Sequence, residues 1–349
     1  MLRIYGSKKM RKERFILLIL LLAIPGLCWG QAKVGTAGVQ FLKVGVSARA
    51  MGMAEAFVGV ADDAGALYYN PGGLLQLQKP DHMFTHIVYP AGIQFEYLGT
   101  AWPVPKLQAA VGAHVTFLHT DKMEVTTPEQ PYGTGQMFTA SDLAIGVTYS
   151  QRLTNKFSVG GNVKFIEERL ADQKATGLAF DVGTYYNTGW KRIVIAMVIT
   201  NFGPDMNFVD SPFAMPINFK FAASIRALER YPHALIIAGE GWHPNDNLEQ
   251  FNIGVEYGFM DMAFLRVGKK INGAKRYSWS EYLDNNDNDP YVEYPIINED
   301  GAISTDGLTL GAGLKIKLPT LALKIDYAYT NVNKLGSNHF FTLGIGGGK

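Results

Sequence analysis

Residues 37–77 read AGVQFLKVGVSARAMGMAEAFVGVADDAGALYYNPGGLLQL, the most distinctive stretch of the chain. The stretch is too polar to cross a bilayer as a helix, and too rich in small residues to be a core helix of a large soluble domain. Between Ala48 and Ala56, alanine and glycine alternate with larger residues, which lets backbone pack closely against backbone. We therefore expect two or three short helical pieces, tightly joined.

Capping residues predict where these pieces begin and end. A carboxylate accepts hydrogen bonds from the free amides of a first helical turn, so Asp62 or Asp63 can cap a helix that follows. Pro71 disfavours the α conformation at Asn70, which predicts that this helix ends there. Asn70 can then cap the next turn, in which Pro71 takes the first position and no amide is lost.

The chain after this stretch alternates apolar residues with polar or small ones, which is the period of β-strands. In Leu107–Phe117, for example, Gly112, His114 and Thr116 separate the apolar residues. About fourteen such runs occur, and most have the roughly 9–11 residues that a tilted strand needs to cross a bilayer. They are 82–88, 92–102, 107–119, 139–151, 156–168, 176–186, 192–201, 217–226, 233–241, 249–257, 262–270, 307–316, 320–329 and 338–346.

An even number of strands can close without leaving an unpaired edge in lipid. The fold class that we predict is all-β: a closed antiparallel transmembrane β-barrel of about 14 strands with a short helical N-terminal plug. The alternative is a soluble β-sandwich, which would have shorter strands and more charge on its outer face than a chain with 18% charged residues.

Aromatic residues support the membrane barrel, because tyrosine and tryptophan prefer the headgroup level of a bilayer. Those near strand ends are Tyr89, Trp102, Tyr149, Tyr185, Tyr186, Trp190, Trp242, Tyr257, Tyr327 and Tyr329.

The connections between the predicted strands differ in length. Tight turns are expected at 103–106, 154–155 and 317–319, and long connections at 121–138, 202–216 and 271–306. Barrels of this kind keep short turns in the periplasm and long loops outside.

The first thirty residues have the pattern of a secretory signal peptide. Basic residues precede the apolar run Phe15–Ile24, and Cys28 and Gly30 are small residues at −3 and −1 of a cut before Gln31. A single anchoring helix is the alternative, but the run is shorter than the ~20 residues a bilayer requires. The predicted organisation is therefore 1–30 signal peptide, 31–80 plug and 81–349 barrel.

Three short segments carry a resemblance to a known family. They are Ala48–Met53 (ARAMGM), Ala56–Ala64 (AFVGVADDA) and Tyr69–Leu74 (YNPGGL), and together they resemble the N-terminal signature of the PorV/PorQ family. That family consists of outer-membrane barrels related in fold to the FadL fatty-acid channels. Its pattern has Ala where this chain has Gly72. On this resemblance the plug motif comprises Ala48, Arg49, Gly52, Asp62, Asp63, Asn70, Pro71 and Gly72.

The resemblance implies a location in the bacterial outer membrane, in contact with its lipids, and it leaves two functions open. A PorV/PorQ-type barrel would bind exported or surface proteins in type IX secretion and surface attachment. A FadL-like barrel would be a channel for hydrophobic small molecules, and an apolar pocket beside the plug would distinguish it. The inward residues named from the alternation are mostly small or charged, which slightly disfavours an apolar lumen.

Enzyme chemistry is not indicated, and no catalytic, cofactor or metal site is predicted. His82 and His86 are four apart on a strand, about 13 Å from each other, too far to share a metal. Residues 284–289 are rich in oxygen ligands, but they lack the glycine and closing glutamate of an EF-hand, so a solvated acidic loop is preferred to a calcium site. Beyond the leader the net charge is −4, which argues against a nucleic-acid partner.

Two groups of residues remain as candidate functional positions. Charged residues expected to face the lumen are Asp181, Lys220, Glu256, Arg266 and Asp326, and they would either pair and hold the plug or line a conduction path. The segment 271–306 combines acidic residues with aromatics, which are favoured at interfaces. Its candidate docking residues for a protein partner are Trp279, Tyr282, Tyr291 and Tyr294; the alternative is a flexible acidic loop that shields the barrel mouth.

Overall fold

The computed structural model describes residues 35–89, 92–209, 211–272, 307–331 and 337–347. The chain divides into two compact units, Met1–Lys33 and Val34–Lys349, and the account below concerns the second. The predictions for the leader, the candidate docking residues and the acidic segment 284–289 all lie outside the described residues.

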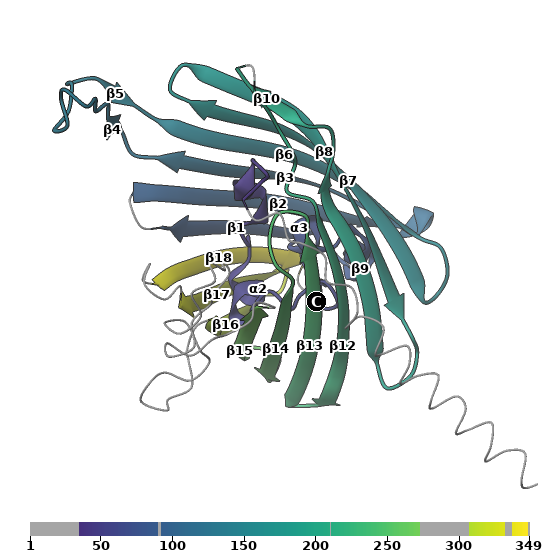
Figure 1. Ribbon diagram of the computed structural model, residues 1–349. Helices are drawn as coiled ribbons and strands as arrows, with labels where there is room; N and C mark the ends of the chain where they lie inside the picture. Colours follow the sequence, from purple (N-terminus) through teal and green to yellow (C-terminus); the bar gives the residue numbers. More distant parts are fainter. Residues whose placement is uncertain (1–34, 90–91, 210, 273–306, 332–336, 348–349) are drawn as a thin grey trace, which may run out of the picture. The chain divides into compact units, whose positions relative to one another are not determined.

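Fourteen strands of the described part form one closed antiparallel barrel, as predicted (Figure 1). They are β1 Asp81–Val88, β2 Ile93–Val104, β3 Ala109–Thr120, β6 Ala140–Arg152, β7 Phe157–Leu170, β8 Gln173–Asn187, β9 Ile193–Phe202, β12 Asn218–Arg230, β13 His233–Pro244, β14 Gln250–Phe259, β15 Ala263–Asn272, β16 Leu308–Lys317, β17 Leu321–Asn331 and β18 Ser337–Gly347. The last strand pairs with the first from Asp81↔Gly346 to Val88↔His339, which closes the barrel.

Short elements lie between and before these strands. Two small hairpins are β4 Met123–Glu124 with β5 Met137–Phe138, and β10 Met206–Phe208 with β11 Ser211–Phe213. The helical pieces are η2 Gln40–Lys43, α2 Ala48–Gly52, α3 Ala66–Tyr69, η3 Pro71–Gln76 and η5 Pro105–Leu107. None of the described helices is long and apolar enough to span a membrane.

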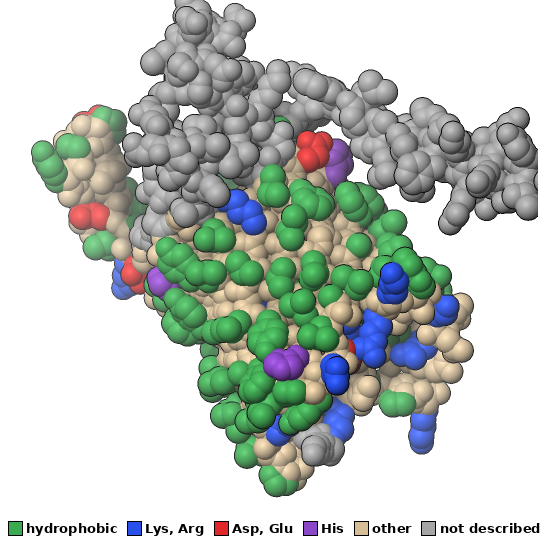
Figure 2. Space-filling view, turned by 90° about the horizontal axis from the view of Figure 1, so that it is seen from below, with side chains coloured by type: hydrophobic (Ala, Val, Ile, Leu, Met, Phe, Trp, Pro, Cys, Tyr) green, Lys and Arg blue, Asp and Glu red, His purple; other side chains and the backbone are tan. Residues whose placement is uncertain are grey.

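The outer face of the barrel is apolar. Strands β6 and β9 show the alternation clearly: Ile145, Val147, Ile195 and Met197 are exposed on the outside, while the residues between them are buried. Apolar side chains spread over the face of the molecule seen in Figure 2, with Lys and Arg gathered toward one end. In water such a surface would be unfavourable, whereas in a bilayer it is the surface that lipid requires.

The aromatic girdle is smaller than predicted. Trp102, Tyr149, Tyr186 and Trp190 are exposed on the outside. Three other members of the predicted set lie inside: Tyr185 and Trp242 are buried at inward positions of their strands, and Tyr89 packs against the interior apolar cluster.

Strand direction assigns the two ends of the barrel. Because neighbouring strands are antiparallel, the three predicted tight turns fall at one end, and the small hairpins in the predicted long connections 121–138 and 202–216 fall at the other. We take the end with the tight turns as periplasmic.

Residues 37–77 run through the lumen from its outer end to its periplasmic end. Ala37 pairs with Ala214 in the outer loop that carries β10 and β11, whereas η3 leads into β1 at the periplasmic rim. Between these points the chain is mostly buried, and Ala54 has 0% exposure. This segment is called the plug below.

Candidate functional site in the barrel lumen

Arg49 on the plug makes the densest set of contacts with the wall. Ser47 caps α2 by accepting from the Ala50 amide. Arg49 donates from Nε and Nη2 to both carboxylate oxygens of Glu256 on β14, at 2.8 and 2.9 Å. Its Nη1 donates to Asp62 and Asp63 at 2.6 and 2.8 Å. Three carboxylates thus surround this largely buried guanidinium and compensate its charge.

The contacts continue along the wall. Arg266 donates to Glu256 at 2.6 Å and to Asp326 at 2.6 Å, and Arg226 donates to Asp62 at 3.0 Å. Three of the five predicted lumen charges therefore belong to one structure that joins the wall to the plug. We call it the Arg49 network; its members are Arg49, Asp62, Asp63, Arg226, Glu256, Arg266 and Asp326.

The other two predicted lumen charges lie elsewhere on the inner wall. Asp181 pairs with Lys164 at 2.7 Å and accepts from the Asn201 amide at 2.7 Å. Lys220 is buried with its amine 3.8 Å from the centre of the Trp242 ring. These groups are held by the wall itself rather than by the plug.

Glu240 is a plug contact that the sequence did not indicate. One of its oxygens accepts from the amides of Phe57 and Val58, both at 2.9 Å, and the other accepts from the Trp242 indole at 2.6 Å. Alternation placed residue 240 on the inner face, but nothing in the sequence signalled that it would bind plug amides.

Inward hydroxyls of the wall bind further backbone groups of the plug. Thr342 accepts from the Ala48 amide at 2.9 Å and Thr309 from the Ala54 amide at 3.0 Å. Ser224 donates to a plug carbonyl at 2.6 Å. Irregular backbone inside a membrane barrel must find such partners, because lipid offers none. In the sequence, the one sign of these contacts was the presence of Ser and Thr at inward positions of the predicted strands.

The predicted Asn70–Pro71–Gly72 turn forms. Tyr69 ends α3, and the Asn70 side chain accepts from the Gly72 amide at 3.0 Å to cap η3, with Pro71 at its start. Asn70 also donates to the carbonyl of Thr184 on β8 at 3.1 Å. A Cβ on Gly72 would lie 2.8 Å from a wall carbonyl oxygen on β8, so only glycine fits at this approach.

The predicted aspartate cap takes a different form. Asp63 accepts from the Gly65 amide at 2.9 Å, just before α3, but α3 itself has no side-chain cap. Asp62 points instead to Arg49 and Arg226. The ion pairs decide the orientation of Asp62, and the sequence alone did not reveal these partners.

One side of the outer lumen is apolar, which the expectation of small or charged residues did not include, whereas the outer parts of β12 and β13 carry the inward charges Lys220 and Glu240. Ile87, Phe95, Tyr97 and Phe340, on the neighbouring strands β18, β1 and β2, point inward and are at most 1% exposed. Val46 of the plug belongs to the same apolar cluster, with partly buried Val44, Tyr68, Tyr89 and Leu118 packed against it. A second cluster brings together Phe41, Leu42, Ile166, Met206 and Met215.

The second cluster lies beside an irregularity in the wall. Pairing of β8 with β9 shifts register between Phe180 and Val182 and reaches no farther toward the outside than Phe180↔Phe202. Asn201 has a φ of 60° at this point. The outer part of β8 is accompanied by β10 instead. The apolar interior is therefore bordered here by a loop as well as by strands.

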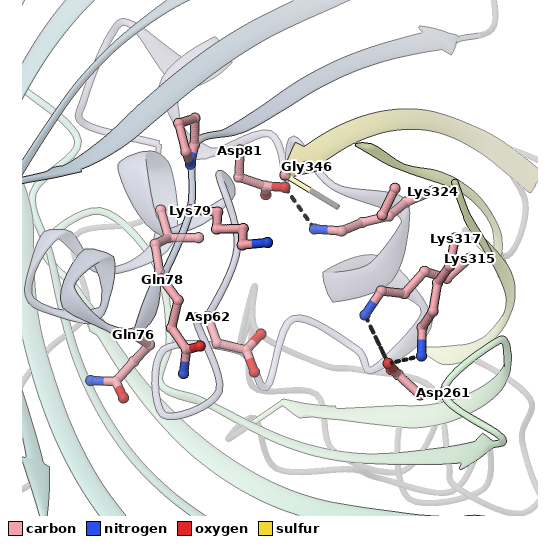
Figure 3. Close-up of a pocket in the computed structure, with 14 residues that line it drawn as sticks. Asp62, Gln76, Gln78, Lys79, Asp81, Asp261, Lys315, Lys317, Lys324 and Gly346 are labelled. Carbon is pink, nitrogen blue, oxygen red and sulfur yellow. Dashed lines mark hydrogen bonds and ion pairs between the residues drawn. The ribbon is translucent and has the colours of Figure 1, made fainter. Parts of the chain in front are cut away.

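A polar pocket of about 470 Å³ lies at the periplasmic mouth (Figure 3). Its charged lining groups are Asp62, Lys79, Asp81, Asp261, Lys315, Lys317 and Lys324. A second pocket of about 250 Å³ shares Asp62, Asp261, Lys315 and Lys324 with it and reaches Arg49. Water from the periplasm can thus approach the Arg49 network. No group of described residues could hold a metal ion.

Comparison with known proteins supports the fold. The sequence matches no protein-family model and no curated protein. The CymD monoaromatic hydrocarbon channel aligns at 11% identity and a TM-score of 0.53, over 87% of this chain and 97% of that chain. The toluene transporter TodX of Pseudomonas putida aligns at 11% identity and a TM-score of 0.51, over 86% of this chain and 97% of its own.

The toluene transporter TbuX of Ralstonia pickettii is similar to the same degree, with 11% identity, a TM-score of 0.51, and coverage of 84% of this chain and 96% of that one. Likeness at this identity concerns the fold. The chain thus has the FadL-like barrel fold, and its closed wall with an apolar outer face places it in the bacterial outer membrane.

Proposed function

We propose that the protein is a channel for apolar small molecules, with the outer half of its lumen as the entry site. The observation that carries the proposal is the apolar surface formed by Ile87, Phe95, Tyr97 and Phe340. Wall positions that face a water-filled pore would be polar. These side chains are covered instead by the plug: they share an apolar cluster with Val46, and the ring of Tyr68 packs against that of Tyr97.

Among the described residues, the part of the plug that covers the apolar surface makes fewer ion pairs with the wall than the part below it. Residues 37–46 are held to the wall by a backbone bond from Gly38 to Ala214 and by Gln40 and Lys43, both of which donate to Asp246. They are joined to the lower plug by Tyr68, which donates to the Leu42 carbonyl, and by the Val46 amide, which donates to the Tyr69 hydroxyl. Below Ala48 the plug is bound by the Arg49 network and the wall hydroxyls. Residues 37–46 could therefore move aside for a ligand while the lower plug stays in place.

The solved channels of the same fold agree with this proposal, since their names describe monoaromatic hydrocarbon and toluene transport. A molecule without charge would gain roughly 25 cal/mol per Å² of apolar surface transferred from water into the outer lumen. The Arg49 network and the polar pocket beneath it offer no comparable surface, so passage toward the periplasm would require the lower plug to rearrange.

Photolabelling tests the proposal. The purified barrel in an uncharged detergent is irradiated with a diazirine-bearing hydrocarbon, and the labelled residues are mapped by mass spectrometry. We expect labels at Phe95, Tyr97 and Phe340, competed by excess toluene. Labels confined to the outward Leu98 and Phe341, and insensitive to toluene, would show that the probe only dissolves in the detergent belt and would contradict the proposal.

A protein-binding role is the second candidate, favoured by the resemblance of residues 48–74 to the PorV/PorQ signature. On this view Trp279, Tyr282, Tyr291 and Tyr294 would dock an exported or surface protein. Partners that co-purify with the detergent-extracted barrel, and are lost when residues 279–294 are deleted, would support it. Labelling of the lumen that toluene competes would support the channel instead.

A further inference from the structure

The periplasmic pocket carries more positive than negative charge in reach of a ligand. Lys324 is matched by Asp81 at 2.8 Å. Lys315 and Lys317 share a single carboxylate, that of Asp261, at 3.0 and 2.7 Å. Burial raises the pKa of Asp261, but hydrogen bonds from the two lysines lower it below its ordinary value, so the carboxylate is ionised and already occupied.

Of the four lysines that line the pocket, Lys79 has no counter-ion among the described residues. No hydrogen bond or ion pair within the described chain engages its amine. Figure 3 shows that amine directed into the pocket, on the side opposite Lys315 and Lys317. A Cβ built on Gly347 would lie 2.6 Å from the Lys79 stem, so the stem rests against the end of β18. The glycine at 347 thus leaves room for a lysine that points inward.

The remaining carboxylates do not supply the missing charge. Asp81 uses one oxygen for Lys324 and the other for the Ala64 amide, at 2.8 Å. Asp62 faces the pocket but is bound by Arg49 and Arg226 from outside it. Four lysines therefore face three carboxylates around a space of about 470 Å³, with Lys79 unpaired and Lys315 and Lys317 sharing one partner.

We propose that the periplasmic mouth is a binding site for a phosphate group, held by Lys79, Lys315 and Lys317. Lysine amines bind phosphate as point charges from several directions, and three donors on two sides of one pocket suit that chemistry. The phosphate can come from a free anion in the periplasm or from a phospholipid headgroup at the inner leaflet. Binding here is independent of what enters the outer lumen.

Titration of inorganic phosphate into the full-length mature barrel, in an uncharged detergent and at low chloride, tests the site. We expect saturable binding by calorimetry and a rise in the unfolding temperature, because a ligand that binds only the folded state stabilises it. Lys79→Gln and Lys317→Gln should each weaken binding at least tenfold. Lys106→Gln is the matched control, since Lys106 lies in a periplasmic turn outside the pocket, and it should bind as the parent does.

A second experiment identifies the source of the phosphate. Barrels extracted from membranes are washed and their bound phospholipid is quantified. Phospholipid retained by the parent and lost from Lys79→Gln would identify a headgroup, whereas binding of inorganic phosphate alone would identify a free anion. Equal binding by the parent, Lys79→Gln and Lys317→Gln in both arms, or no binding in either, would overturn the proposal. Heat-modifiable migration on gels confirms that each variant is folded.

Discussion

At the scale of single residues, the position of the plug depends on ionic and backbone contacts that only the folded chain brings together. Arg49 meets Glu256 across 207 positions of sequence, and Glu240 meets the Phe57 amide across 183. A buried charge needs partners of this kind, because removal from water costs several kcal/mol per ion in the absence of compensation. The lower plug is therefore a fixed part of the lumen.

Replacing Arg49 with alanine should release the lower plug. The change leaves buried carboxylates without their cation, which typically costs about 3–5 kcal/mol. In an Ala54→Cys background, a bulky aqueous maleimide should label the cysteine much faster once Arg49→Ala is added. Arg226→Ala, which removes only the half-exposed pair with Asp62, should change the rate little. Equal rates in the Arg49→Ala variant and its parent would show that Arg49 does not hold the plug.

Gly268 provides a test of close packing between wall and plug. An alanine Cβ there would lie 2.4 Å from the Ala54 amide nitrogen, so the plug would have to shift. Overpacking of this kind costs roughly 1–3 kcal/mol. Thermal unfolding in detergent should show a lower midpoint for Gly268→Ala. Gly239→Ala is the control because its nearest neighbour would be 3.6 Å away, and an equal midpoint in both variants would argue against the close approach.

At the scale of elements, the strands could be predicted from the sequence, but the contacts of their inward side chains could be predicted only in part. All fourteen predicted runs overlap strands of the barrel, because alternation is imposed at every position by lipid on one side and lumen on the other. The turn at Asn70 was predictable as well, since its capping bonds are local. In each of these cases the physical cause lies within a few residues of the element concerned.

Other features depend on contacts that alternation cannot identify. Alternation assigns a residue to the inner or outer face of a strand. It does not predict that the inward Ser224 binds plug backbone, or that the inward Phe95 contributes to an apolar surface. Trp242 and Tyr185 were assigned to the girdle because aromatics near strand ends usually lie there. Both point inward. Trp242 is held by Glu240 and Lys220, which also lie on the inner wall.

The closing pair of strands gives a prediction at this scale. Phe84 on β1 lies opposite Leu343 on β18, both on the outer face. Directly opposed residues have Cα atoms about 4.5–5.5 Å apart, which suits a disulfide. Phe84→Cys with Leu343→Cys should cross-link within one chain on oxidation. Phe84→Cys with Val115→Cys, on strands that are not neighbours, should not. A monomer that never cross-links at 84 and 343 would be incompatible with closure.

At the scale of the whole molecule, the barrel presents three surfaces of different chemistry: an apolar exterior, an apolar patch on one side of the outer lumen and a charged periplasmic mouth. This arrangement fits a protein that accepts apolar molecules from outside and presents charge to the periplasm.

The long segment 273–306 distinguishes the two candidate functions at this scale. Deleting residues 279–294 should leave strand pairing intact, since loops add little to it, and heat-modifiable migration should be unchanged. For a channel, toluene-competed labelling of the lumen should persist in the deletion variant. Loss of that labelling in a barrel that still folds would mean that the segment helps to form the entry site.

The most direct test of the channel account is to fasten the upper plug in place. Ala37 and Ala214 form a parallel bridge, which puts their Cα atoms about 4.8 Å apart and within disulfide range. Cells producing Ala37→Cys with Ala214→Cys are given N-phenylnaphthylamine, an apolar dye that an intact outer membrane excludes, and its fluorescence is followed before and after reduction. The account predicts slow entry when the disulfide is formed, and fast entry, as in the parent, after reduction. Entry at the same rate in both states, above that of cells lacking the barrel, would contradict it.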